Sequence, residues 1–116
     1  MPKFLALYMG RPEGFEAWQA LEQQEREKRE AEGMKAWQNW HAQHASIISD
    51  DGGPVGKTKR TSASGVTDHK NEVCGYVLIE AASHDAAARL FENHPHFAIF
   101  PGDAVEIMEC TTIPGM

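Results

Sequence analysis

The last third of this chain alternates strand and helix signals, and this pattern constrains its fold more than any other feature. Val73–Glu80 is rich in β-branched and aromatic residues, and Ser83–Phe91 opens with a helix-capping serine followed by helix-forming alanines. His94–His96 interrupts the helix at a proline, and Ala104–Cys110 returns to a strand pattern. A looser version of the same pattern occupies the N-terminal half. Two such halves predict a ferredoxin-like α+β domain, βαββαβ, with an antiparallel sheet.

The predicted strands are apolar on both faces. Phe4–Met9 contains only apolar and aromatic residues, and Val73–Ile79 carries apolar side chains on both of its faces as well. A chain of 116 residues has only enough helix to cover one face of its sheet. The uncovered face therefore predicts a homodimer in which two sheets meet face to face.

The length predicts a single domain over residues 1–116. Apolar spacing predicts a helical region from about Phe15 to Ile48, but residues 22–32 are almost wholly polar and are interpreted as a helical extension. A single straight helix over the whole region would be about 50 Å long. We therefore expect either a break near Gly33 or a first segment that projects from the body.

The next segment is rich in glycine and polar residues. Asp50–Pro54 is expected to end the helical region in a turn. Val55–Val66 is expected to hold an irregular second strand on an edge of the sheet, with a Ser-Ala-Ser-Gly turn inside it, and Thr67–Glu72 to be a polar loop. Gly52–Thr58 misses the spacing of a phosphate-binding loop, and no helix signal follows it, so nucleoside triphosphate binding is excluded.

The charge and hydropathy of the chain argue against nucleic acids and membranes as partners. With 17 acidic and 11 basic residues the net charge is −6, whereas nucleic-acid binding needs a basic surface. No apolar run approaches the roughly 20 residues of a membrane span, and Phe4–Met9 is too short for a secretory signal. We expect a cytoplasmic protein without a nucleic-acid or membrane partner. Cys74 and Cys110 fall on predicted strands that flank the first strand, out of disulfide reach, so both are expected to be free thiols.

Six histidines supply the candidate chemistry. In His94-Pro95-His96, the proline fixes the backbone and can aim a neighbouring histidine into a cleft, so His96 and His94 are candidate acid–base catalysts. In the alternative interpretation, Pro95 only ends the helix and the histidines cap its carbonyls. His41 and His44 share a helix face and could hold a metal if His94 and His96 supplied further ligands, but no sequence signal brings these residues together, so no metal or cofactor is predicted.

Aromatic residues near these histidines suggest a ligand pocket. Trp37, Trp40 and His41 recur at helical spacing, and Tyr76 lies on a predicted central strand. These four residues are the candidate ligand-binding residues of an apolar pocket between helix and sheet. The alternative is that these aromatic side chains are simply part of the core.

The order of these segments resembles the YCII-related family. The matching segments are Lys3–Gly10, Met34-Lys-Ala-Trp37-Gln-Asn-Trp40, Gly52-Gly-Pro-Val-Gly56 with its polar strand, Gly75–Ala81, Asp85-Ala-Ala, Pro95-His96 and Val105-Glu-Ile107. The resemblance covers most of the chain except the polar segment Gln23–Glu32. No single motif is diagnostic of the family, and the resemblance rests on the order of several weak motifs along the chain.

The resemblance implies a dimeric α+β barrel with a ferredoxin-like protomer. It also implies a small-molecule enzyme that moves a proton, of isomerase or lyase type, since a dehydrochlorinase-like activity on an aromatic substrate is attributed to the family. Pro95-His96 carries over by motif, which makes His96 the acid–base group, whereas no aspartate partner can be placed. The competing hypothesis is a non-catalytic module that binds a small ligand or another protein.

Overall fold

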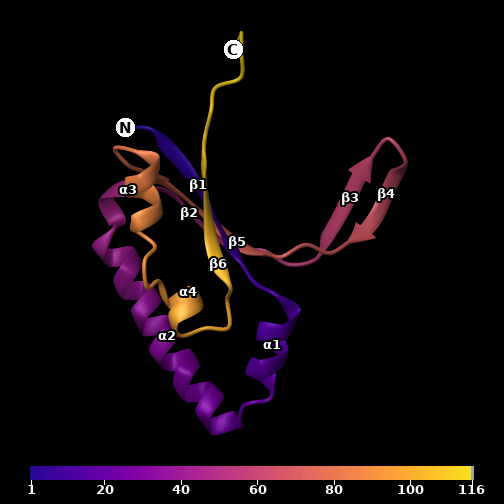
Figure 1. Cartoon of the computed structure of the whole chain (residues 1–116), viewed down its shortest axis with the longest axis vertical. Coiled ribbons are helices and arrows are strands. Elements are labelled where there is room, and N and C mark those ends of the chain that lie inside the picture. Colours follow the sequence, from indigo (N-terminus) through magenta and orange to yellow (C-terminus); the bar gives the residue numbers. More distant parts are fainter. Residues whose placement is uncertain (116) are drawn as a thin grey trace.

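The computed structural model describes residues 1–115, which form one main antiparallel sheet packed against helices (Figure 1). The elements are β1 (Lys3–Met9), α1 (Pro12–Gln19), α2 (Gln23–Gln43), the 3-10 turn η1 (Ala45–Ile47), β2 (Ile48–Pro54), β3 (Thr58–Ser62), β4 (Gly65–His69), β5 (Val73–Glu80), α3 (His84–Arg89), α4 (Pro95–Ala98) and β6 (Ala104–Glu109). The four-stranded sheet has the order β2-β5-β1-β6, and every neighbouring pair is antiparallel. This is the strand order of the ferredoxin-like fold, so the predicted fold class is confirmed.

The alternation of β1 sets the two faces of the sheet. Phe4, Ala6 and Tyr8 are buried against the helices, where they join a core that includes Trp40 and Phe91. The intervening side chains of β1 are only partly buried. The structure thus has one covered face and one apolar face without a covering helix.

The helical region divides at a different place from the one predicted. α1 ends at Gln19, and α2 then runs without interruption through Gly33. The expected break at Gly33 is therefore wrong. A Cβ atom at Gly33 would collide with the ring of Phe100, so this glycine is needed for close packing rather than for a bend.

The run Asp50–Pro54 is an edge strand and not the predicted turn. β2 pairs with β5 through two register shifts, between Ile48 and Asp50 and between Asp50 and Gly53. Gly52 has a φ of +59°, and a Cβ there would collide with the carbonyl of Tyr76. Gly52 therefore lets an irregular strand approach β5, where the turn-forming composition of the segment had suggested a loop.

The segment predicted to add an edge strand leaves the main sheet instead. β3 and β4 form a separate two-stranded hairpin that projects from the body (Figure 1). Its turn falls in the predicted Ser-Ala-Ser-Gly sequence, where Gly65 has a φ of +107°. The predicted loop Thr67–Glu72 is partly strand, since β4 continues to His69.

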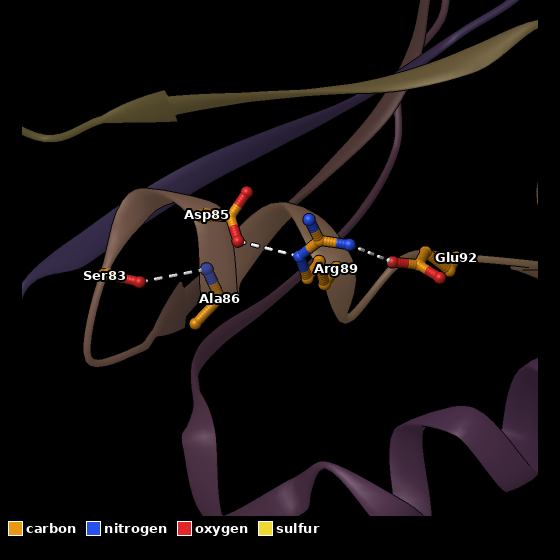
Figure 2. Close-up of polar contacts among 5 residues, drawn as sticks. All are labelled: Ser83, Asp85, Ala86, Arg89 and Glu92. Atoms are coloured by element: carbon orange, nitrogen blue, oxygen red, sulfur yellow. Dashed lines mark hydrogen bonds and ion pairs between the residues drawn. The ribbon is translucent and has the colours of Figure 1, made fainter.

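The C-terminal half follows the sequence signals closely. The hydroxyl of Ser83 accepts the amide N–H of Ala86 and caps α3, and Arg89 pairs with Asp85 and Glu92 along the helix (Figure 2). α3 is shorter than predicted, ending at Arg89. Both cysteines are free thiols, as expected. Within residues 1–115, no helix has the length and apolar character of a membrane span.

Candidate functional site

A cavity of about 430 Å³ lies between α2 and the sheet. Its wall comes from β1 and α2 (Tyr8, Met34, Trp37, His41), from β2 (Asp51, Gly53, Pro54), from β5 (Cys74, Gly75, Tyr76), and from α4 and the loop after it (His96, Phe100). Most of this wall is apolar or aromatic, with a few polar groups. A cavity of this size and character suits a small planar molecule.

His96 is fixed in the cavity wall by the short helix α4. Pro95 begins this helix, a position that tolerates its missing amide hydrogen. The His96 side chain is 5% exposed, and its Nε2 lies 2.7 Å from the carbonyl oxygen of Met9. Because a carbonyl oxygen only accepts, Nε2 carries the proton and donates it. In the neutral ring, Nδ1 is therefore an unprotonated acceptor.

Two imidazoles line the cavity, those of His41 and His96, and the Nδ1 atom of His96 is one of its basic atoms. Among residues 1–115 it has no hydrogen-bond partner, and it is not one of the side-chain atoms sealed from solvent without a partner. Burial lowers the pKa of His96, and the hydrogen bond to Met9 and the charge of Asp103 offset part of that effect. The ring is therefore neutral at pH 7, the state that a general base requires.

His94 lies behind His96 and supports it. It is completely buried, and its Nδ1 accepts the amide N–H of His96 at 3.0 Å, which caps the start of α4. This contact differs from the sequence alternative, in which the histidines cap carbonyls at a helix end. Burial, then the charges of His96, His41 and His44, lowers the pKa of His94 to about 3. His94 does not line the cavity.

The two tryptophans predicted for the pocket have different surroundings. Trp37 lines the cavity and packs edge-on against His94, with ring centroids 4.6 Å apart. Trp40 is 7% exposed, donates its indole N–H to the carbonyl of Leu90 at 3.0 Å, and packs on Phe91. Trp40 thus belongs to the core beneath the cavity rather than to its wall.

A histidine–carboxylate pair lies elsewhere on the cavity wall. His41 Nδ1 is 3.9 Å from Asp51 Oδ1, a separation that allows electrostatic attraction but is too long for a hydrogen bond. The Asp51 side chain is 85% exposed, which leaves it free to move. His44 turns away, with its Nδ1 2.7 Å from the carbonyl of Trp40. In the described part of the chain, no cluster of three or more metal-ligating side chains includes these histidines.

Of the remaining residues of the cavity wall, some were predicted from the sequence and some were not. Tyr76 is at the cavity on β5, but its strand partner is Leu7, on the sheet face away from the helices, and its role in ligand binding stays a prediction. Cys74 was not predicted at the site. It is the extra residue of a bulge, since Tyr8 pairs with Gly75 while Met9 pairs with Val73. Burial raises the pKa of its thiol, so Cys74 stays protonated.

Two apolar wall residues, Met34 and Phe100, were also missed. Met34 precedes Trp37 by three residues and His41 by seven, and this spacing puts all three on one face of α2. That periodicity was the signal for Met34. The signal for Phe100 was indirect, because a glycine in the middle of a helix often marks the close approach of another side chain.

Comparison with known proteins supports the fold but gives no family. No family model matches the chain, and no curated protein matches its sequence. Among solved structures, it resembles 5-chloro-2-hydroxyhydroquinone dehydrochlorinase (TftG) from Burkholderia phenoliruptrix AC1100, in a complex with 2,5-dihydroxybenzoquinone. The TM-score is 0.57 with 17% sequence identity, over 94% of this chain and 93% of that one. The two proteins therefore share an α+β fold with an antiparallel four-stranded sheet and helices.

Proposed function

We propose that this protein is a small-molecule enzyme of lyase or isomerase type in which His96 is the general base. The observation that carries the proposal is the neutral His96 ring in an aromatic cavity, with Nε2–H donated to the Met9 carbonyl and Nδ1 left open. This arrangement fixes the tautomer and the direction of the basic lone pair before any ligand arrives. His94, which holds the His96 amide, is proposed as a support for the catalytic group.

The proposed step is a proton transfer to His96 Nδ1. The substrate loses a C–H or O–H proton, and the bonding electron pair forms a new π bond in the substrate. In an elimination, a leaving group on the ring departs with its own electron pair, and the histidinium then releases its proton to water, which restores the base. In an isomerisation, the histidinium returns the proton to another atom of the substrate, which restores the base directly. The His41–Asp51 pair is the second polar group placed to hold an oxygen of the ligand.

The proposed ligand is a single planar ring that carries oxygen substituents. Trp37, Tyr8 and Phe100 provide aromatic surface for such a ring, and the cavity volume of about 430 Å³ accommodates one. The shared fold with a dehydrochlorinase supports this class of substrate, and we propose that the chain is a divergent member of the YCII-related family. No cofactor is needed for the step as written.

A homodimer is part of the proposal. The face of the sheet opposite the helices carries Leu5, Leu7 and Leu78, which are only partly buried, and Met108, which is 41% exposed. Such a face is stabilised when a second sheet packs on it. We further propose that residues 1–116 form one domain with residues 22–32 as a helical extension, and that the protein works in the cytoplasm.

A non-catalytic ligand-binding module is the second candidate. The observation that favours it is that His96 contacts a backbone carbonyl where many acid–base dyads have a carboxylate, and that His41 and Asp51 are 3.9 Å apart. Such a module would bind the same kind of ring without converting it.

Binding and turnover can be tested separately. We expect 2,5-dihydroxybenzoquinone to quench the fluorescence of Trp37, and a chlorinated hydroxyhydroquinone to release chloride in the presence of the protein. His96→Gln should abolish chloride release while the quinone still binds within about tenfold of the wild-type affinity. His69→Gln is the matched control, since His69 is exposed and does not line the cavity. Binding without chloride release in the wild type would favour the binding module, and no binding would contradict both candidates.

A further inference from the structure

The hairpin β3–β4 forms an arm, which we define as residues 57–70. β2 and β5 pair within the main sheet, and the arm continues the same pair of chain segments beyond it (Figure 1). Its strands pair only with each other, from Thr58 with His69 to Ser62 with Gly65. Every residue from 59 to 72 is exposed. A lone two-stranded hairpin is at best marginally stable in water, so a projecting arm of this kind is stabilised by a surface on which it can lie.

The arm is basic, whereas the rest of the protein is acidic. It carries Lys57, Lys59, Arg60 and Lys70 against Asp68, which gives a net charge of +3. Because the whole chain has a net charge of −6, the residues outside the arm carry −9. Lys59 is neutralised by Asp68, with Nζ and Oδ1 2.6 Å apart. The other three cations form no ion pair within residues 1–115. The arm therefore presents unpaired positive charge to a partner.

Two of these cations lie together where the arm meets the body. Lys57 precedes Thr58 and Lys70 follows His69, and these two inner residues are paired across the hairpin. Both lysines line a hollow of about 740 Å³, together with Lys59 and the carboxylates of Asp68 and Glu72. Three cations against two carboxylates leave the hollow with one excess positive charge, and like charges that face each other across a ribbon repel. A further carboxylate in the hollow would offset that charge.

We propose that the arm docks on the acidic surface of a second copy of this chain, with Lys57, Arg60 and Lys70 facing its carboxylates. The inference rests on the homodimer proposed above. In that dimer the open sheet faces meet, and an arm that extends from the end of the sheet lies beside the partner's body. The partner supplies the −9 charge that complements the +3 of the arm.

A second copy fits the arm better than a nucleic acid does. A polyanion that approaches the arm also meets the acidic body to which the arm is attached, and repulsion from the body opposes the attraction of the arm. A second copy is equally acidic, but its apolar sheet face adds a hydrophobic contribution that a nucleic acid lacks. The arm then adds charge complementarity to an association that the sheets already favour.

Sedimentation velocity of the full-length protein at several salt concentrations tests the proposal. The variant Lys57→Glu/Lys70→Glu should raise the dimer dissociation constant by about tenfold or more at low salt. The control Lys28→Glu/Lys35→Glu makes the same change in net charge at two exposed lysines of α2 that form no ion pair, and should not weaken the dimer. The wild-type dimer should weaken as salt rises, because the arm contacts are solvent-accessible charge pairs.

A second variant removes the arm without changing the sheet. Replacing residues 57–70 by an Asn-Gly turn keeps a hairpin connection between β2 and β5 and should weaken the dimer and reduce its dependence on salt. A dimer that is insensitive to both arm variants would overturn the arm proposal alone. A wild-type protein that is monomeric would overturn the homodimer and the arm together. Loss of affinity for a short DNA duplex, with the dimer unchanged, would assign the arm to nucleic acid instead. Quinone titration of each variant keeps the cavity proposal separate, since no residue of the arm lines the cavity.

Discussion

The buried His94 predicts that the protein loses stability in mild acid. In the folded state, burial and neighbouring histidines lower the pKa of His94 from its ordinary value of 6.5 to about 3. Between these two values the unfolded chain is protonated at this site and the folded protein is not. Stability is therefore complete above about pH 6.5 and is lost as the pH falls toward 3. This is the sign expected for a histidine that is held neutral by burial.

The size of the effect follows from the two pKa values. One bound proton changes the free energy of unfolding by about 1.4 kcal/mol per pH unit. From pH 6.5 to about 4.5 the loss is therefore roughly 3 kcal/mol from His94 alone, a large part of the 5–15 kcal/mol typical of a domain. Burial also lowers the pKa of His96, which adds to the loss in the same direction.

His94→Asn separates this titration from the structural role of the side chain. An asparagine oxygen can still accept the amide N–H of His96 and cap α4, but it does not titrate. The free energy of unfolding is measured in urea by tryptophan fluorescence, at fixed protein concentration between pH 7 and 4.5. Its decrease with falling pH should be less steep in the variant, because the variant takes up nearly one proton fewer on unfolding. The comparison concerns slopes, because the smaller side chain lowers stability at every pH. Equal slopes for the two proteins would refute the assignment of the acid sensitivity to His94.

Substitutions at three further positions test single contacts by thermal unfolding. Tyr8→Phe removes a buried hydroxyl that has no partner, so it should change stability by less than about 1 kcal/mol, and a loss above about 2 would mean that the hydroxyl is bonded. Gly33→Ala should cost about 1–3 kcal/mol, because the added methyl group displaces the ring of Phe100, and a stabilised variant would show that the ring is not packed there. Ser83→Ala should cost about 1 kcal/mol through loss of the α3 cap, whereas Ser83→Asn should cost almost nothing; equal losses would rule out the cap.

Sequence patterns predicted the helices and strands correctly where the conformation of a segment depends on residues that are close in the chain. The short apolar run Phe4–Met9 predicted the central strand, and Ser83 predicted the start of α3, because both signals depend on neighbours in sequence. Asp50–Pro54 has the composition of a turn, yet it pairs with β5 as an edge strand. The glycines of this segment predicted a turn, whereas Gly52 allows a bulge that packs against the Tyr76 carbonyl. A glycine in a turn and a glycine in a bulged strand can be distinguished only once the neighbouring strand is known.

The candidate site was predictable in its chemistry more than in its geometry. Pro95-His96 identified the histidine that lines the cavity, because a proline at a helix start fixes the direction of its neighbour. Trp37 and Trp40 looked equivalent in sequence, but a three-residue step along a helix also turns the side chain by about 60°, and this places Trp40 in the core. The Met9 carbonyl, which sets the tautomer of His96, carries no sequence signal because any residue offers one.

The proposed function depends on His96 being a neutral base whose Nδ1 atom is open to the ligand. Long-range nitrogen–proton NMR of the histidine rings measures this directly. At pH 7 we expect His96 in the Nε2–H tautomer, with an unprotonated Nδ1 whose signal shifts when 2,5-dihydroxybenzoquinone is added. A charged ring, the Nδ1–H tautomer, or an Nδ1 signal that does not respond to the quinone would contradict the account.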